Sequence, residues 1–582
     1  MNRFSIFICI ACFICLSGCT QNQSEKQSFS SVSKTITTDS NIAYGSFSEG
    51  FRSPPNEVRT KAYWLWLNGQ VTKESITREL EAMKSNGYGG AVICDALASG
   101  KNTDEVAHGA DFASKEWIEL LKHAVREADR LDMVLSLNGQ SGWNFGGPTV
   151  QPSEALKKVV FVEQQFQGPQ KLSIKLNVPD TLLFYKDIIV QAYKSNNKKE
   201  MGSILNWDLK SFDKSIGAKG IYPLEKYWNM KPETVLDGTI PKDQIIDLSS
   251  NVHDGVLEWN VPKGKWTVVR YGMTCTGERP NRPSENADGL NLDHMSKDAL
   301  TSYYQKVLLP LMNEAKDAGN SLVYLHSDSW EMKVINWTQD FREEFESRRG
   351  YDPLNYMPVL TNRIVGNRAE SNRFLFDIRR TVGDLVAENH YQYLSELAHK
   401  NEMLMHPESG GPHAAPIDGL YTMSFNDELM GEFWTRSNTH RIKASERLTV
   451  RQSACAAHTN GKKFVTAEGP TSIGPQWERA PRELKGVIDR VFCSGVNKIV
   501  WHTFSASPEK FGKPGNSYFA GTHLNANATW WEESKSFIEY LNRCSYLLSL
   551  GLFEADVLYY YGSNVPNFVF MKNEVKELDF GY

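Results

Sequence analysis

Short apolar runs alternate with amphipathic stretches along most of the chain. Residues 62–67 form a compact apolar run, and residues 73–86 follow it with apolar side chains at helical spacing. A short apolar run predicts a buried strand, whereas apolar positions three and four residues apart predict one face of a helix. The pattern predicts strands at 62–67, 90–95, 133–137, 322–325, 403–405, 464–467 and 498–503, and helices at 73–86, 115–131, 298–317, 338–349, 373–400, 438–457, 481–494 and 533–548.

Polar or acidic residues follow nearly every predicted strand. Repeated strand–helix units of this kind are typical of a (β/α)₈ barrel, in which the loops at the carboxyl ends of the strands form the active site. The sequence therefore predicts an α/β fold with a TIM-like (β/α)₈ barrel.

Two stretches interrupt the alternation. Residues 156–275 contain strands and turns, which indicates an inserted β-rich domain, because loops at the carboxyl face of a barrel tolerate long insertions. Residues 555–562 predict a strand that opens a further domain. We therefore expect the barrel in two parts, at 47–155 and 276–550, with the inserted domain at 156–275 and the start of a β domain at 551–582.

The amino-terminal segment predicts export and lipid attachment. Arg3 precedes an apolar run at 4–16 that is too short for a permanent membrane anchor, and the run ends in Leu16-Ser17-Gly18-Cys19, which is similar to a bacterial lipobox. We expect a lipoprotein signal peptide at 1–18, a lipid on Cys19 and a flexible tether at 19–46. The protein would then be anchored in the cell envelope at the outer membrane, and an ordinary signal peptide is the alternative.

Composition excludes several classes of protein. The chain has 64 Lys and Arg against 69 Asp and Glu, so no overall charge favours nucleic acid. The cysteines beyond the leader are scattered and odd in number, which argues against a disulfide scaffold or a zinc ribbon; they are Cys94, Cys275, Cys455, Cys493 and Cys544. Aromatic residues make up 11%, and aromatic faces with polar edges suit sugar binding, although most aromatic residues pack in cores.

Acidic residues at the predicted strand ends are the candidates for catalysis. They lie beside Trp, Phe, Gly and Pro in the segments 326–331, 406–411, 426–434 and 466–469. Glycoside cleavage requires two carboxyl groups across the bond, one to protonate the leaving oxygen and one to activate water or attack carbon. An apolar neighbour such as Trp330 beside Glu331 is typical of a catalytic acid.

The same acids could hold a hard cation. Asp328, Glu408, Asp427 and Glu432 supply oxygen ligands of the kind that Ca²⁺ takes, and Ca²⁺ can bind vicinal sugar hydroxyls. The alternative, that these acids bind no metal, stays open. The sequence has no H-x-H or H-E-x-x-H zinc pair, no G-x-S-x-G elbow and no phosphate-binding glycine loop.

Further polar and aromatic side chains near the strand ends are candidates for contacts with sugar. For each Trp core packing is the competing interpretation, and for each His it is structural hydrogen bonding. The candidates are Trp64, Asn68, Asp95, Asn138, His326, Trp330, His406, His413, Trp434 and His502.

Several motifs resemble those of a known family. They include Trp64-Leu65-Trp66-Leu67-Asn68-Gly69-Gln70, His406-Pro407-Glu408-Ser409-Gly410-Gly411-Pro412-His413, Gly431-Glu432-Phe433-Trp434 and Asp489-Arg490-Val491-Phe492-Cys493-Ser494-Gly495-Val496-Asn497. From about residue 51 to 570 the chain is similar to glycoside hydrolase family 106, the α-L-rhamnosidases. The resemblance implies an inverting hydrolase with a catalytic (β/α)₈ barrel, dependence on Ca²⁺, and plant pectic or glycosylated polyphenol substrates.

The resemblance also implies roles for individual residues. Glu331 would be the general acid and Glu468 the general base. Glu432 would be a further candidate that shares the role of general base or binds calcium. Asp328, Glu408 and Asp427 would hold the metal. Family members usually continue into β-sandwich domains, so residues 551–582 would begin such a domain in an apparently truncated chain.

The sequence thus predicts a lipid-anchored, calcium-assisted glycosidase that cleaves terminal α-L-rhamnosyl linkages in plant polysaccharides or rhamnosylated glycans. Its partners would be an oligosaccharide or polysaccharide and, through the lipid only, a membrane, with no nucleic acid. One alternative is a noncatalytic glycan-binding surface lipoprotein derived from such an enzyme. Another, a metal-dependent amidohydrolase on the same barrel, would need clustered His ligands on the early strands, where the sequence has none.

Overall fold

The computed structural model describes residues 44–98, 108–179, 183–195, 203–213, 239–332, 335–410, 415–435, 448–474, 477–560, 562–563 and 565–567. The predicted signal peptide, Cys19 and His413 lie outside these ranges. Among the helices described, none has the length and apolar character needed to cross a membrane.

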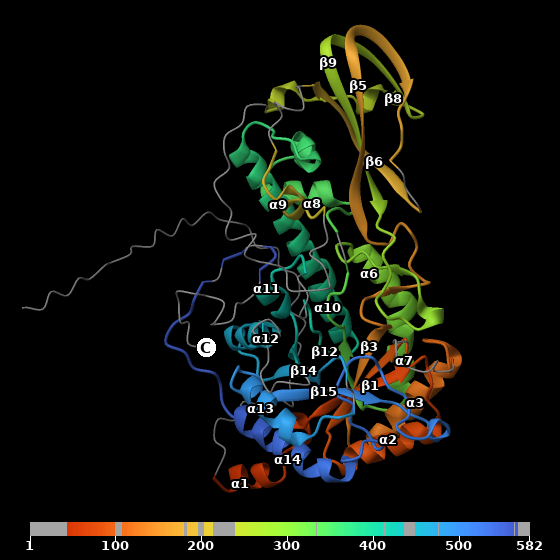
Figure 1. The fold of residues 1–582 in the computed structure, drawn as a ribbon, viewed down its shortest axis with the longest axis vertical. Coiled ribbons are helices and arrows are strands. Elements are labelled where there is room, and N and C mark those ends of the chain that lie inside the picture. Colours follow the sequence, from red (N-terminus) through yellow and green to blue (C-terminus); the bar gives the residue numbers. More distant parts are fainter. Residues whose placement is uncertain are drawn as a thin grey trace, which may run out of the picture. The chain divides into compact units, whose positions relative to one another are not determined.

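An eight-stranded, entirely parallel sheet forms the centre of the fold (Figure 1). Strands that follow one another in the chain lie side by side, in the order β12 (Leu404–Met405), β11 (Leu322–His326), β3 (Val134–Ser141), β2 (Gly90–Ala96), β1 (Lys61–Leu67), β15 (Lys498–Ser505), β14 (Val465–Thr471) and β13 (Leu429–Trp434). The two end strands also approach each other, because the backbone oxygen of Met405 accepts hydrogen bonds from the backbone nitrogens of Asp427 and Glu428, both at 3.1 Å. The prediction of an α/β fold is confirmed.

One strand differs from the prediction. The segment 426–434 was expected to follow a strand, but residues 429–434 are themselves strand β13, whose first five residues are buried. Glu432 therefore lies within a strand and not in a loop. The other seven predicted strands are present with bounds shifted by a few residues.

Helices form in the predicted ranges that the structure describes, whereas residues 438–447 of the helix predicted at 438–457 lie outside the described residues, and the short helices at 44–52, 207–210 and 419–423 were not predicted. In α2 (Lys73–Ser85), Thr72 and Ser75 cap the first turn reciprocally, and Ile76, Leu80 and Met83 are buried on one face. The remaining α-helices are α1 (Tyr44–Arg52), α3 (Lys115–Arg130), α4 (Trp207–Lys210), α6 (Lys297–Tyr303), α7 (Leu309–Ala318), α8 (Phe341–Arg349), α9 (Arg368–Val386), α10 (Tyr393–Lys400), α11 (Gly419–Met423), α12 (Leu448–Thr459), α13 (Pro481–Phe492) and α14 (Trp531–Leu548). π-helical turns at Tyr304–Leu308 and Ala387–Gln392 join α6 to α7 and α9 to α10.

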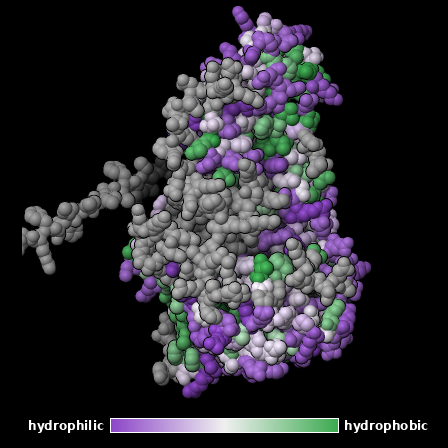
Figure 2. All heavy atoms as spheres, viewed as in Figure 1, coloured by the Kyte–Doolittle hydropathy of each residue, from purple (hydrophilic) through white to green (hydrophobic). Residues whose placement is uncertain are grey.

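The main core lies between the parallel sheet and these helices. All seven residues of β1 are buried. Trp64 and Trp66 point to one side of the strand, with ring centroids 5.4 Å apart, and Trp66 packs on Trp117 of α3 at 5.2 Å. Because side chains alternate along a strand, Tyr63 points to the opposite face. Away from the core, hydrophilic residues predominate on the described surface that Figure 2 shows, and hydrophobic residues form small groups.

The inserted segment forms a second, antiparallel sheet. It consists of β5 (Lys157–Lys175), β9 (Val256–Cys275), β6 (Tyr185–Lys194) and β7 (Ile246–Asp247), with β8 (Val252–His253) paired to β9. Strand β5 is long and continues through a shift of register between Gly168 and Gln170. The antiparallel sheet contacts the segment that follows α8, since Gln191 Nε2 donates to the backbone oxygen of Leu354 at 2.7 Å.

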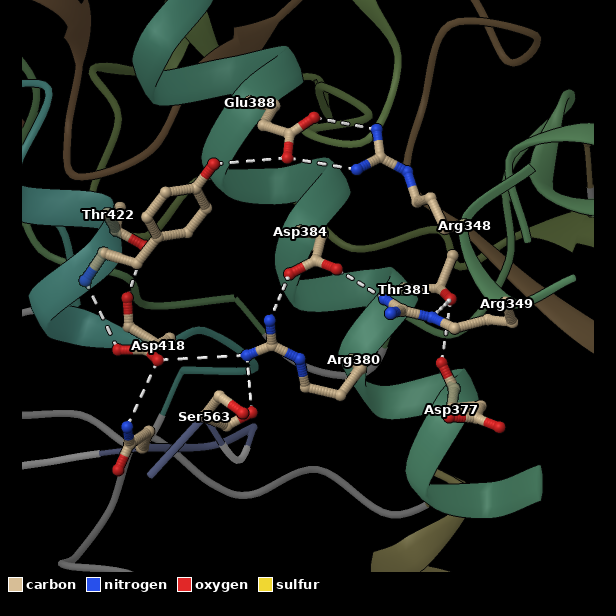
Figure 3. A network of polar contacts seen from close by, with 12 residues as sticks. Arg348, Arg349, Asp377, Arg380, Thr381, Asp384, Glu388, Asp418, Thr422 and Ser563 are labelled. Atoms are coloured by element: carbon tan, nitrogen blue, oxygen red, sulfur yellow. Dashed lines mark hydrogen bonds and ion pairs between the residues drawn. The ribbon is translucent and has the colours of Figure 1, made fainter. Parts of the chain in front are cut away.

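The described residues of the segment 562–567, which are 562–563 and 565–567, lie against α9 and the loop that follows β12 (Figure 3). Arg380 of α9 donates to the backbone oxygen of Ser563 at 2.5 Å, lies 3.0 Å from Asp384 and faces Asp418 at 3.9 Å. Asn567 exchanges backbone hydrogen bonds with the segment 417–419. The described residues before it do not form the strand expected at 555–562: residues 555–560 have no regular secondary structure and are exposed.

Candidate active site

A small cavity of about 70 Å³ opens at the carboxyl ends of the parallel strands, and four carboxylates line it. Each carboxylate comes from, or follows, a strand of the sheet, so the topology brings together residues up to 140 positions apart. The lining consists of Tyr63, Trp143, Asp328, Ser329, Glu331, Glu432, Trp434, Glu468, Thr471, His502, Tyr518, Phe519 and Ala520.

Three carboxylates at this end of the sheet form a buried cluster. Oxygen atoms of Asp328, Glu408 and Glu468 lie within 4.8 Å of one another. Glu408 is fully buried, and neither of its carboxylate oxygens has a hydrogen-bond donor among the described residues. Burial, followed by the charges of Glu468 and its neighbours, raises the pKa of Glu408 well above its usual range.

Glu468 has the same kind of environment with two polar partners. The Thr471 hydroxyl donates to Glu468 Oε1 at 2.9 Å and lies 3.0 Å from Nδ1 of His502. Because a hydroxyl has one proton, Thr471 then accepts from His502 Nδ1–H. Burial lowers the pKa of His502 to about 4, so its imidazole is neutral, and burial together with Asp328 raises the pKa of Glu468 to about 8.

Glu331 and Glu432 complete the acidic wall. Asn281 donates its side-chain amide to Glu331 Oε2, and the backbone nitrogen of Glu331 donates to Asn144 Oδ1 at 3.1 Å. The indole of Trp434 donates to Glu432 Oε1. Burial, reinforced by Glu468, raises the pKa of Glu432 well above its usual range, which favours its protonated form.

Two predicted sugar-binding histidines lie beneath the cavity and support it. His326 is fully buried, with Nε2 2.9 Å from the hydroxyl of Tyr63 and Nδ1 2.5 Å from the backbone oxygen of His406. His406 is also fully buried and bonds through Nε2 to the Thr466 hydroxyl at 3.0 Å. Both act on the site through the residues that they hold, and neither lines the cavity.

The structure brings several candidates together and leaves others outside. Glu331, Glu468, Glu432, Asp328, Trp434 and His502 line the cavity, and Glu408 joins the carboxylate cluster. Asp427 lies elsewhere: its carboxylate lies 2.7 Å from His399 Nε2 and accepts from the backbone nitrogen of Met405 at 2.8 Å. In the three-carboxylate cluster Glu468 stands where Asp427 was expected.

The remaining sugar-binding candidates that the structure describes make contacts within the fold, whereas His413 lies outside the described residues. Trp64 is a core residue whose indole donates to Glu79 at 2.8 Å. Asp95 accepts from Ser141, Ser284 and Trp117. The side chains of Asn68, Asn138 and Trp330 hold the backbone of Ala98, of Gln140 and Gly142, and of Met332 respectively.

Seven cavity residues were not predicted. They are Tyr63, Trp143, Ser329, Thr471, Tyr518, Phe519 and Ala520. Tyr63 could have been predicted, because it directly precedes Trp64 and side chains alternate along a strand. A strand that packs Trp64 and Trp66 against the helices therefore points Tyr63 to the other face. The position of Tyr518 and Phe519 depends on a long loop after β15, for which the sequence pattern has no signal.

Comparisons with known proteins show which family this chain resembles. The model of glycoside hydrolase family 106, described as alpha-L-rhamnosidase, matches residues 52–582. A curated protein of Formosa agariphila named "Putative beta-glucuronidase" is 34% identical over 540 residues, which are 92% of this chain and 44% of that protein. A solved rhamnosidase structure from Novosphingobium sp. PP1Y matches with a TM-score of 0.75 and 25% identity, over 87% of this chain and 61% of that one. The chain thus spans less than half of the curated relative's length.

Proposed function

This chain belongs to glycoside hydrolase family 106, the α-L-rhamnosidase family, and we propose that it hydrolyses terminal α-L-rhamnosyl linkages in plant polysaccharides or other rhamnosylated glycans. The observation that carries the proposal is the cavity lined by four carboxylates at the carboxyl ends of the parallel strands. Glycoside hydrolysis needs an acid and a base on opposite sides of the bond, and this cavity offers four carboxyl groups, of which burial raises the pKa of Glu432 and of Glu468.

We assign Glu331 as general acid and Glu468 as general base of an inverting mechanism. Glu331 is the least buried of the four cavity carboxylates and is held by Asn281 and Asn144, so it can reach the leaving oxygen. Glu468 is fixed by Thr471 and would take a proton from the attacking water. Glu432, protonated in its buried position, would donate a hydrogen bond to a sugar hydroxyl.

The donor set fits the calcium ion that the family resemblance implies. Asp328, Glu408 and Glu468 offer clustered oxygen ligands, and the two oxygens of Glu408 have no other donor among the described residues. When bound, Ca²⁺ would offset the mutual repulsion of these carboxylates and offer coordination to vicinal hydroxyls of the sugar. Without such a charge, burial and Asp328 raise the pKa of Glu468 to about 8, which disfavours the ionised form that a base requires.

We further infer that the parallel sheet is a (β/α)₈ barrel. The order of its strands is that of a closed barrel opened between β12 and β13, where two backbone hydrogen bonds to Met405 bring the ends together. We also propose, from the sequence alone, that a lipid on Cys19 attaches the protein to the outer membrane. Cell fractionation of wild type and Cys19→Ala tests the anchor.

The experiment that tests the activity compares two leaving groups. Wild type, Glu331→Gln and Glu468→Gln are assayed on p-nitrophenyl α-L-rhamnoside and on a rhamnosyl oligosaccharide, with the exposed Glu533→Gln of α14 as control. p-Nitrophenolate leaves without protonation, so loss of the acid should reduce oligosaccharide cleavage far more than cleavage of the nitrophenyl glycoside. Loss of the base should reduce both by about 10³-fold or more.

The anomeric configuration of the released rhamnose, observed by NMR, tests inversion. Undiminished cleavage of the oligosaccharide by either variant would contradict the assigned roles. A folded wild-type protein that binds rhamnosyl oligosaccharides without cleaving them would favour the glycan-binding alternative.

A further inference from the structure

A second cavity lies on the helix side of the parallel sheet, between α2 and the loop that follows β15. Its volume is about 300 Å³, against about 70 Å³ for the catalytic cavity. Glu79 lines it and accepts from the indole of Trp64, which packs toward the helices, whereas Tyr63 of the catalytic cavity points to the other face of β1. This outer cavity and the catalytic cavity are therefore separated by the sheet.

The floor of the outer cavity is buried and polar. Glu79, Ser507 and Asn525 line it, and each is less than a tenth exposed. Glu79 Oε1 accepts from the backbone nitrogen of Ser507 at 2.7 Å, and Asn525 Nδ2 donates to the backbone oxygen of Ser505 at 3.0 Å. The Ser507 hydroxyl accepts from the backbone nitrogen of Asn516 at 3.1 Å. These side chains hold the loop after β15 in place while they line the cavity.

The outer wall of this cavity is also fixed. Asn527 Nδ2 donates to the backbone oxygen of Pro514 at 3.0 Å. Gly515 has a φ angle of 80°, and a Cβ there would overlap the Ser507 hydroxyl, so the loop packs as closely as a glycine allows. A wall held in this way keeps the cavity open. Preformed cavities of roughly 300–1,000 Å³ are typical of sites for small molecules.

The ionisable groups at the rim do not select an ion. Arg78 Nη1 lies 3.5 Å from Glu509 Oε1, and its Nη2 lies 3.7 Å from Glu79 Oε1, so carboxyl groups offset its charge. Glu509 and Lys513 are exposed, and water and salt screen their charges. An ionic ligand would gain little from groups of one sign while it meets groups of the other.

The hydrogen-bonding groups favour hydroxyl groups as partners. Arg78 donates one N–H to the backbone oxygen of Ser507 at 2.7 Å, and a guanidinium has five N–H donors. Burial raises the pKa of Glu79 to about 7, so both forms of its carboxyl group are present near neutral pH. A hydroxyl can donate to the ionised form, accept from the protonated form and accept from Arg78.

We propose that the outer cavity is a second binding site, separate from the catalytic cavity, for a neutral molecule with several hydroxyl groups, of the size of one monosaccharide. Arg78 and Glu79 bind its hydroxyl groups, and Phe504 and Ala526 bound the space that it fills. The site binds its ligand without chemistry, so the inference stands apart from the proposed rhamnosidase activity.

The test is calorimetric titration with L-rhamnose, D-galactose and D-glucose as neutral probes and with galacturonate and glycine as ionic ones. Wild type is compared with Arg78→Met, Ala526→Trp and, as control, Arg126→Met. Ala526 is exposed at the rim, so a Trp there fills the cavity without disturbing the core, and Arg126 is exposed on α3 outside the cavity. We expect a millimolar Kd for at least one neutral sugar in wild type and in Arg126→Met, weakened about tenfold or more in Arg78→Met and Ala526→Trp.

The Ala526→Trp variant distinguishes the outer cavity from the catalytic one, because it leaves the catalytic cavity open. Sugar binding that keeps its wild-type Kd in folded Ala526→Trp would overturn the proposal, since the sugar would then occupy another site. Absence of binding by all three sugars up to about 50 mM would overturn it as well. Tighter binding of galacturonate or glycine than of every neutral sugar, lost in Ala526→Trp, would contradict the neutral class of ligand.

Discussion

The hydroxyl of Tyr63 lies 2.9 Å from Nε2 of His326, in the polar interior of the parallel sheet. Nδ1 of the same imidazole lies 2.5 Å from the backbone oxygen of His406, which can only accept, so Nδ1 carries a proton. In the neutral ring Nε2 is then the acceptor of the Tyr63 hydroxyl. The hydroxyl also lies 3.3 Å from Asp328 Oδ2. The contacts of Tyr63 and His326 therefore connect β1, β11 and the residue after β12 to a carboxylate of the cluster.

Replacement of Tyr63 by Phe should impair the site more than the fold. The variant removes the hydroxyl that donates to His326 and lies beside Asp328, and we expect kcat/KM on p-nitrophenyl α-L-rhamnoside to fall about 10- to 100-fold. Loss of one buried hydrogen bond should lower the free energy of unfolding by about 1 kcal/mol. Steady-state kinetics and urea unfolding measure the two effects.

Tyr303→Phe is the matched control. Its buried hydroxyl donates to the backbone oxygen of Gly139 at 3.0 Å, outside the cavity. A similar loss of stability with unchanged kinetics is expected there. Equal kinetic effects in both variants would show that Tyr63 acts through the fold alone.

Calcium binding should depend on the buried cluster and not on Asp427. We expect Ca²⁺ to raise the melting temperature of wild type, because a ligand that binds only the folded state stabilises it. Asp328→Asn and Glu408→Gln should abolish the shift, whereas Asp427→Asn should retain it, since Asp427 pairs with His399. Calorimetric titration with CaCl₂ alone measures the affinity; a loss of binding in Asp427→Asn only would restore the ligand set expected from sequence.

The contacts of Arg380 predict how the segment 562–567 stabilises the fold (Figure 3). Arg380→Met removes contacts with Asp384, Asp418 and the backbone oxygen of Ser563, while Asp384 keeps its ion pair with Arg349. We expect a loss of about 1–3 kcal/mol in the free energy of unfolding, measured in urea. Arg373→Met, exposed on the same helix, should change it by less than about 0.5 kcal/mol, and equal effects of the two variants would be evidence against a stabilising role of this network.

The strands were largely predictable because each is a short, buried apolar run between helices. Strand β13 was the exception, since its sequence Leu429-Met430-Gly431-Glu432-Phe433-Trp434 contains a carboxylate that a strand pattern does not accommodate. Glu432 is buried because it faces the other acids of the cavity, which is a tertiary circumstance. The composition of a six-residue window cannot show that Glu432 will face these acids in the folded protein.

The same strand boundary decided which acids meet. Parallel strands collect the residues that follow them at one edge and the residues that precede them at the other. Asp328 and Glu408 follow β11 and β12, so their prediction as neighbours is matched by the cluster. Asp427 and Glu428 precede β13 and lie at the opposite edge, where Glu428 pairs with Lys498 at 3.1 Å. Because the start of β13 was not predicted, Asp427 and Glu408 were equivalent candidates for metal binding.

A buried carboxyl outside the cavity predicts the pH dependence of stability. Glu79 of α2 accepts from the Trp64 indole at 2.8 Å and from the Ser507 backbone nitrogen at 2.7 Å, yet burial raises its pKa from 4.5 to about 7. The folded protein thus binds a proton more tightly there than the unfolded chain does. The resulting stability is fully present below pH 4.5 and is lost as the pH rises through 7.

Glu79→Gln tests this sign, because an amide has no proton to lose in this range. The variant can lack one of the two hydrogen bonds, but that cost is the same at every pH. We therefore expect the free energy of unfolding of wild type minus that of Glu79→Gln to decrease by about 3 kcal/mol between pH 4 and pH 8 in urea titrations. Glu533→Gln controls for removal of one exposed carboxyl. A difference that stays constant over the range would mean that the pKa of Glu79 is the same in the folded and unfolded protein, with its two donors offsetting the burial of its charge.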